Sequence, residues 1–133
     1  MRVFSGGVAR LAAGCLLTGL SGCGASAPSA PPAPTGPPVL SNTITITSAG
    51  ANPNYIQVNA GDRVRFINND ARSHNMTSDP HPEHDACPEL NQVGFLEPGQ
   101  SRETGNLVIV ETCGFHDHDN PDIQSLHGQI VIK

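Results

Sequence analysis

Short stretches in which apolar and polar residues alternate recur along the chain from residue 42 onward. In Thr43–Thr47 isoleucine alternates with threonine, and in Arg63–Asn68 the apolar Val64 and Phe66 fall on one side. A period of two is typical of a β-strand that buries one face. Turn-forming residues such as Ala60-Gly61-Asp62 separate these stretches. The pattern predicts short strands joined by turns.

The rest of this region continues the pattern, and no part of it repeats apolar residues with a helical period. Short strands separated by turns are typical of an all-β Greek-key sandwich. We predict such a sandwich, of about seven or eight strands, over residues 39–133. Its further strands are predicted at Tyr55–Val58, Ser73–Thr77, Ser101–Val110, Thr112–His118 and Gln129–Ile132.

Residues 1–23 have the features of an export signal. Arg2 and Arg10 provide the positive charge, and the apolar run Leu11–Leu20 is too short to span a bilayer. The run ends in Leu20-Ser21-Gly22-Cys23, which resembles the lipobox of bacterial lipoprotein signal peptides. The resemblance implies cleavage before Cys23 and attachment of lipid to its thiol, which would anchor the protein in a membrane.

An ordinary secretory signal, cut near Ala25 or Ala27, is the alternative. In either case we expect an exported protein, located in the periplasm or on the cell surface. Gly24 follows the cysteine, where an aspartate would indicate retention in the inner membrane. The outer membrane is therefore favoured if the source is a diderm bacterium.

Residues 24–38 contain neither a charge nor a large side chain, and many of them are proline. Such a segment cannot bury enough apolar surface to fold, and proline favours extended conformations. We predict a disordered tether that holds the domain away from the membrane.

Composition and charge narrow the possible partners. Aromatic residues make up only 4% of the 133-residue chain, whereas it has 12 prolines and 14 glycines, which suits a turn-rich β domain. The formal charge is -5, and removing Arg2 and Arg10 with the leader brings it to about -7. No basic patch is present, so we expect no nucleic-acid partner, and we expect a monomer.

The segment from Cys113 to His118 carries the strongest chemical signal. His116 and His118 stand two residues apart with Asp117 between them. Imidazole and carboxylate groups bind borderline divalent metals. A strand would point His116 and His118 to one side, and Phe115 and Asp117 to the other. The alternative is a polar loop that contains two solvated histidines.

From residue 42 to the end, the order of these motifs resembles a cupredoxin domain of the plastocyanin and azurin type. The most specific signal is the run from Ala60 to Asn69, followed closely by His74. The matching segments are Ile44–Ile46, Ile56–Asp70, Ser73–Ser78, Phe95–Ser101, Phe115-His116 and Gly128–Ile132.

The resemblance implies a copper site whose residues match only in part. In cupredoxins the histidine after the Asn-Asn-Asp turn binds copper, and His74 has that place. Asp117 stands where the family has a ligand cysteine, and Leu126 stands where it has an axial methionine. His118 is the available second histidine. The intense colour of blue copper needs a thiolate ligand, so we expect a pale site rich in nitrogen and oxygen.

We therefore predict a metal site formed by His74, His116 and His118, with Asp117 as a further candidate ligand. Such a ligand set suits Cu(II), and Zn(II) is possible.

Three other histidines have different expected roles. His81 and His84 lie in a Pro- and acid-rich loop, which is either a second, weaker copper-capturing loop or a solvated acidic loop. His127 immediately precedes the last predicted strand, and we expect it to be exposed.

Two of the four cysteines remain for the folded domain, because Cys15 leaves with the leader and Cys23 takes lipid. An even pair in an exported domain predicts a disulfide between Cys87 and Cys113. That bond would pin the loop with His81 and His84 to the strand of His116. The alternative is that Cys87 or Cys113 binds copper as a thiolate.

Three functions are compatible with these features. The favoured one is a membrane-tethered copper-binding protein, acting in copper handling or electron transfer with a redox or copper-transfer partner. The alternatives are a metal-free structural or interaction module and a His-ligated copper redox enzyme. The sequence has no nucleophile-base pair, phosphate loop or cofactor motif, so we do not predict an enzyme.

Overall fold

The structure is a computed structural model, and it describes residues 34–133. The predicted signal peptide, the predicted lipidation at Cys23 and the first ten residues of the predicted tether lie outside the described residues. Within residues 34–133, no helix is long and apolar enough to cross a membrane.

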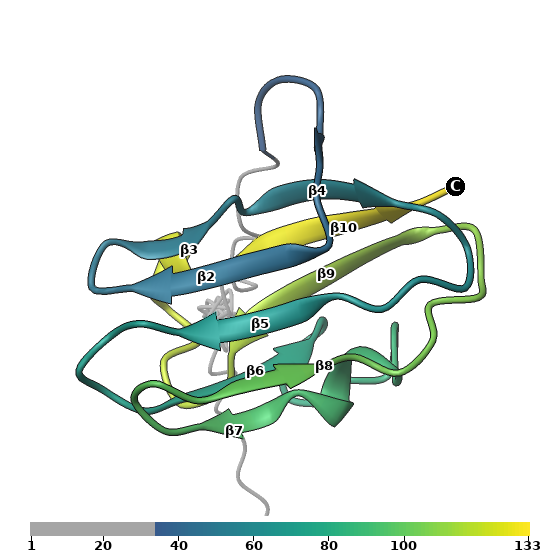
Figure 1. Cartoon of the computed structure of the whole chain (residues 1–133). Coiled ribbons are helices and arrows are strands. Elements are labelled where there is room, and N and C mark those ends of the chain that lie inside the picture. The colour runs from purple at the N-terminus through teal and green to yellow at the C-terminus, as the bar shows by residue number, and fades with distance from the viewer. Residues whose placement is uncertain (1–33) are drawn as a thin grey trace, which may run out of the picture.

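Two β-sheets pack face to face, and the all-β sandwich predicted from the alternation is confirmed (Figure 1). The larger sheet, sheet A, contains in spatial order β1 (Val39–Leu40), β4 (Tyr55–Val58), β10 (Gly128–Ile132), β9 (Thr112–Asp117), β6 (His74–Ser78) and β7 (Gly94–Leu96). The smaller sheet, sheet B, contains β3 (Gly50–Asn52), β2 (Thr43–Thr47), β5 (Arg65–Asn68) and β8 (Ser101–Glu103). Two short 3-10 helices, η1 (Leu90–Gln92) and η2 (Gln124–Leu126), lie between strands.

The core fills the space between the sheets, and it uses the side chains that the alternation places inward. Ile44 and Ile46 of β2 are fully buried, as are Phe66 of β5 and Phe115 of β9. The two aromatic rings meet edge to face, with centroids 5.3 Å apart. This contact joins the centres of the two sheets.

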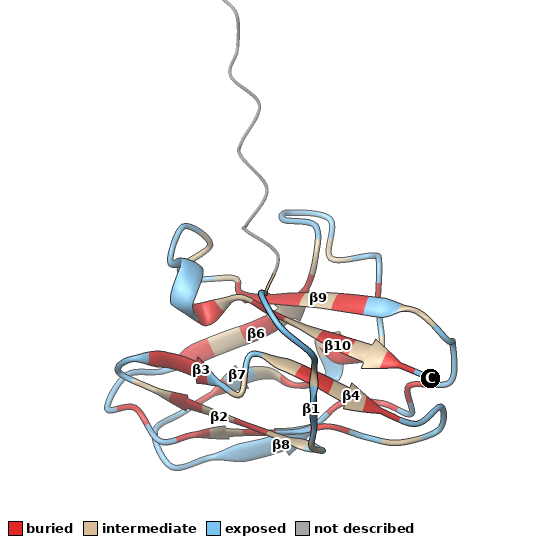
Figure 2. Cartoon of the chain, turned by 90° about the horizontal axis from the view of Figure 1, so that it is seen from above, coloured by how far each residue is buried: buried red, intermediate tan, exposed pale blue. Residues whose placement is uncertain are grey.

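One predicted strand is shorter than expected. The apolar run after Glu103 predicted a strand to Val110, but β8 ends at Glu103. Residues 104–111 instead form the loop that connects β8 in sheet B to β9 in sheet A. Figure 2 colours the chain by burial, and this loop contains both buried and exposed residues. Leu107 is buried and hydrogen-bonded to the turn at Gly61, whereas Val108–Val110 are exposed. The apolar run Leu107–Val110 is therefore part of a loop, and only Leu107 of this run packs into the core.

The predicted disulfide is confirmed. Cys87 and Cys113 are bonded, with Cα atoms 5.7 Å apart, and both side chains are buried. Cys113 lies in β9, and Cys87 ends the loop that follows β6. The bond therefore ties this loop to β9, as expected. It also means that neither sulfur is available as a thiolate ligand while the disulfide is intact.

Candidate metal site

Strand β9 places its polar side chains on two different faces of sheet A. Phe115 and Asp117 point into the core and are fully buried, as the alternation predicted. His116 points to the opposite, outer face, yet it is only 1% exposed. His118 follows directly after the strand, in a turn. Something must therefore cover His116 on the outer face.

The cover is the loop of residues 79–86, which leaves β6 and folds back against β9. Its first residue, Asp79, donates its backbone N–H to the carbonyl of Gly114 in β9, at 3.0 Å. The side-chain amide of Asn91 donates to the carbonyl of His84 at 2.7 Å and accepts the backbone N–H of Ser78 at 2.8 Å. With the disulfide at Cys87, these contacts hold both ends of the loop.

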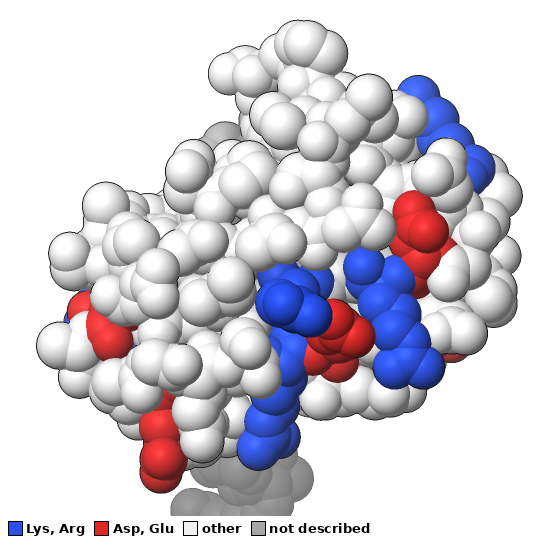
Figure 3. Space-filling view, in the orientation of Figure 1, with Lys and Arg blue, Asp and Glu red and all other residues white. Residues whose placement is uncertain are grey.

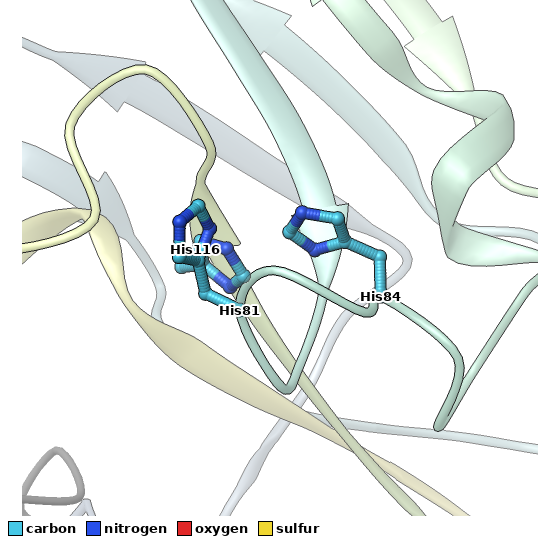
Figure 4. A group of neighbouring side chains, drawn as sticks. All are labelled: His81, His84 and His116. Atoms are coloured by element: carbon cyan, nitrogen blue, oxygen red, sulfur yellow. The ribbon is translucent and has the colours of Figure 1, made fainter. Parts of the chain in front are cut away.

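The loop brings three histidines together. One nitrogen from each of His81, His84 and His116 lies within 4.8 Å of the others (Figure 4). The ring centroids are 5.3 Å apart for His81 and His84, 5.5 Å for His81 and His116, and 5.0 Å for His84 and His116. Imidazoles that share one ion at a metal–nitrogen distance of about 2.0–2.1 Å and a tetrahedral angle have centroids about 5 Å apart.

Two further histidines flank these three. The Nδ1 atom of His118 lies 2.8 Å from Nε2 of His84, and its ring centroid lies 5.1 Å from that of His81. On the other side, the ring of His127 lies 5.6 Å from that of His116. We call the five residues His81, His84, His116, His118 and His127 the outer histidine cluster.

Hydrogen bonds fix the lone pairs of the central residues. Nδ1 of His116 donates to Oδ1 of Asp79, at 2.6 Å, which leaves the lone pair on Nε2. Nδ1 of His84 donates to the carbonyl of Ser78, at 2.8 Å, which leaves the lone pair on Nε2, where it accepts from Nδ1 of His118 at 2.8 Å. Carboxylate and carbonyl partners of this kind orient imidazoles that bind metals.

Gly114 makes room for the Asp79–His116 contact. A Cβ atom at Gly114 would collide with the carboxylate of Asp79. The absence of a side chain there lets the carboxylate lie flat on the outer face beside His116.

Burial lowers the pKa of the His116 imidazole below its ordinary value. The carboxylate of Asp79 acts in the opposite direction, and the neighbouring imidazoles of His84 and His127 lower the pKa further. The ring is therefore kept neutral, which is the form that binds a metal.

The structure does not bring His74 together with His116 and His118. His74 points into the core, because it alternates with the buried Met76 along β6. Its Nδ1 lies 2.9 Å from Oδ2 of Asp117, and its Nε2 lies 3.1 Å from Oδ2 of Asp70. Both ring nitrogens of His74 are therefore engaged by carboxylates, and neither is free for a metal in this arrangement.

Asp117 is the centre of this inner network. Burial raises the pKa of its carboxyl, but hydrogen bonds from the backbone of Asn75, from His74 and from Asn120 outweigh burial and lower it below its ordinary value. The backbone N–H of Asp119 adds a further bond. Asp117 therefore stays ionised and orders the turn that carries His118.

Comparisons with known proteins agree with the fold. No family model and no curated protein sequence matches the chain. Among solved structures, a purple cupredoxin from Nitrosopumilus maritimus is 16% identical, with a TM-score of 0.56, over 70% of this chain and 100% of that one. Oxidised plastocyanin from Dryopteris crassirhizoma is 20% identical, with a TM-score of 0.54, over 68% and 99%. A reduced amicyanin mutant is 18% identical, with a TM-score of 0.53, over 68% and 80%. The domain therefore has the cupredoxin fold.

The copper ligands that the resemblance implied do not fit at the position where the family would place them. His74 is held between two carboxylates, Asp117 replaces the cysteine, and the buried Leu126 replaces the methionine. The outer histidine cluster lies on the other face of β9, and its buried Nε2 of His116 has no hydrogen-bond partner among the described residues. The residues present therefore fit a nitrogen-ligated ion there.

The expectation that His127 is exposed is wrong, because its side chain is half-buried beside the ring of His116. Gly128 pairs with Phe115 in the antiparallel ladder of β10 and β9, so the residue before it lies beside His116. In the sequence, His127 directly precedes a predicted strand. Only the register of this strand against β9 shows that His127 lies beside His116.

Proposed function

We propose that this protein is an exported, membrane-tethered copper-binding protein whose metal site is the outer histidine cluster. The observation that carries the proposal is the convergence of His81, His84 and His116, with the lone pairs of His84 and His116 directed by fixed hydrogen bonds. His118 is a further candidate ligand, because its ring lies about as far from His81 and His84 as these lie from each other, and its contact of 2.8 Å with His84 would have to open on binding.

Imidazole ligands suit copper, and they also suit zinc. Bound copper would supply the capacity to accept and release one electron. Because Cys87 and Cys113 are joined in a disulfide, Cu(II) here has no thiolate ligand and should be pale.

The exposure of the loop favours copper handling over electron transfer. His81 is exposed, and it lies on a surface loop that a partner protein can reach. A ligand at the surface can be exchanged for a ligand of a copper-transfer partner without opening the sandwich. Electron transfer with a redox partner is the second role, since the cupredoxin fold is shared with plastocyanin.

Titration of the exported protein with Cu(II), Cu(I) and Zn(II) tests the proposal. Absorption and EPR spectra should show one nitrogen-ligated Cu(II), and His116→Ala and His84→Ala should each weaken binding at least tenfold. His74→Gln should leave the affinity within about twofold of the parent, because its side chain lies on the other face. An intensely blue product would contradict the disulfide, and a protein that binds no metal would support the metal-free module.

The membrane attachment rests on the lipobox alone. Cys23→Ala should release the exported protein from the membrane fraction, and an unchanged distribution would contradict the lipid anchor.

A further inference from the structure

His127 lies where η2 meets β10, beside His116 on the outer face of sheet A. In the ladder of β10 and β9, Gly128 pairs with Phe115, so the next row places His127 against His116. On the other side of β9, the same row contains Thr77, which pairs with His116. The rings of His116 and His127 have centroids 5.6 Å apart and planes inclined by 25°.

This row contains three buried polar atoms that have no hydrogen-bond partner in the described part of the chain. They are Nε2 of His116, Nδ1 of His127 and Oγ1 of Thr77. The other ring nitrogen of His127 donates to the carbonyl of Pro121, at 2.8 Å, so the lone pair lies on Nδ1. The other ring nitrogen of His116 donates to Asp79. The two rings, whose centroids lie 5.6 Å apart, therefore each carry a buried lone pair that no group of the described residues uses.

Buried acceptors without a donor are costly and rare. The two nitrogens cannot satisfy each other, because both carry lone pairs. One cation satisfies both. Two imidazoles on one ion, at a metal–nitrogen distance of about 2.0–2.1 Å and a tetrahedral angle, have centroids about 5 Å apart, and the rings of His116 and His127 are slightly further apart, at 5.6 Å.

We propose that His127 is a ligand, through Nδ1, of the same ion that His116 binds through Nε2. This inference rests on the proposed function and extends its site from the loop and β9 to β10. In this arrangement His81 and His84 reach the ion from the loop side and His127 from the sheet side. Only the nitrogens of His81, His84 and His116 already lie within 4.8 Å of one another, so the ring of His127 has to move toward the ion when it binds.

The variant His127→Gln tests this inference. Glutamine can still donate a hydrogen bond to the carbonyl of Pro121 but offers no imidazole lone pair. In a competition titration with Cu(II), its affinity should fall at least tenfold relative to the parent. Gln129→Ala, two residues further along β10, is the matched control and should bind as the parent does. With Zn(II) as a diamagnetic probe, long-range ¹H–¹⁵N NMR should show a shift of Nδ1 of His127 on binding.

The outcomes separate this inference from the proposed function. If the parent and Gln129→Ala bind Cu(II) and His127→Gln binds within about twofold of them, His127 is not a ligand, although the copper-binding function stands. An unshifted Nδ1 in the Zn(II)-loaded protein, as expected if a water occupies the site, would also overturn the inference. If the parent binds neither metal, the proposed function fails and the inference fails with it.

Discussion

At the scale of single residues, Asp117 gives the clearest link between sequence and structure. It stands where the cupredoxin resemblance implied a cysteine, and its carboxylate holds His74 through a buried contact of 2.9 Å. The same carboxylate accepts bonds from the backbone of Asn75 and from Asn120. Where the family would place copper, this chain therefore has a hydrogen-bonded network of its own side chains.

Asp117 should make stability depend on pH. Its pKa is lowered in the folded state, so it contributes stability above its unfolded pKa and loses that contribution as pH falls through the folded pKa. Asp117→Asn should lower the free energy of unfolding by about 1.5–3 kcal/mol at pH 7. As pH falls below about 4, its stability should fall less than that of the parent. Urea unfolding at several pH values measures both effects.

The exposed Asp122 provides the control for Asp117, since Asp122→Asn removes the same charge without removing a buried contact. Equal losses of stability in the two variants would show that net charge, and not the inner network, is responsible.

Asp79 should act as a positioning residue for the metal site. It does not contact the ion in the proposed arrangement. Its carboxylate accepts a hydrogen bond from the Nδ1–H group of His116 and so orients the ring. Asp79→Asn should lower Cu(II) affinity by about 10–100-fold and change the EPR parameters of the bound ion. Asp85→Asn removes an equal charge from the same loop, and it should change affinity by less than about threefold. Equal effects would reduce the role of Asp79 to general electrostatic attraction.

At the scale of elements, the site depends on how the loop of residues 79–86 is held. Its backbone carries a residue with an unusual conformation, because His84 has a φ of 55° although it is not glycine. Three contacts hold His84 there: its backbone N–H bonds to Pro80, its carbonyl accepts from Asn91, and its ring donates to Ser78. Such an over-determined conformation is typical of a functional position.

The disulfide should support both the fold and the site. Cys87→Ser with Cys113→Ser should lower the free energy of unfolding by about 3–4 kcal/mol, since the bond closes a loop across a sequence separation of 26 residues. Cu(II) affinity should also fall, because the loop then has one end free. Chemical unfolding and copper titration of the double variant measure the two effects, and alkylation of the unreduced parent should modify neither cysteine. Unchanged copper affinity in a folded double variant would show that the hydrogen bonds alone position the loop.

The sequence predicted the strands better than the site. Alternation in β2 and β9 was sufficient to place Ile44 and Phe115 inward and His116 outward, because the pleat has a period of two. It could not show that a loop folds back over His116, since residues 79–86 have no periodic pattern. Nor could it show that His127 lies beside His116, which depends on the register of β10 against β9. The resemblance to cupredoxins implied a ligand role for His74. In this chain, however, the ring of His74 contacts the carboxylates of Asp117 and Asp70.

At the scale of the whole molecule, the charges are distributed unevenly. Arg63, Arg65 and Arg102 line one surface groove, together with Glu103, and Figure 3 shows Lys and Arg atoms interspersed with Asp and Glu atoms on the face of sheet B. The loop over sheet A instead carries carboxylates, namely Asp79, Glu83 and Asp85. An acidic surface raises the local concentration of cations, so this arrangement favours approach of a metal to the outer histidine cluster.

Copper should stabilise the whole domain, because the proposed ligands come from the loop, β9 and β10 and meet only in the folded state. A ligand that binds only the native state adds about 2.7 kcal/mol at a free concentration of 100 times its Kd, and binding of copper to histidines of the unfolded chain reduces this value. The urea midpoint of the parent should therefore rise on addition of Cu(II). His116→Ala should lose this increase.

The comparison with His74→Gln distinguishes the two faces of β9. This variant should be less stable than the parent without metal, because it loses the contacts to Asp117 and Asp70. It should nevertheless keep the full increase in urea midpoint when Cu(II) is added, since its outer histidine cluster is intact. If His74→Gln loses the increase and His116→Ala keeps it, copper binds on the inner face. The Asp70–His74–Asp117 network would then have to open to accept the ion.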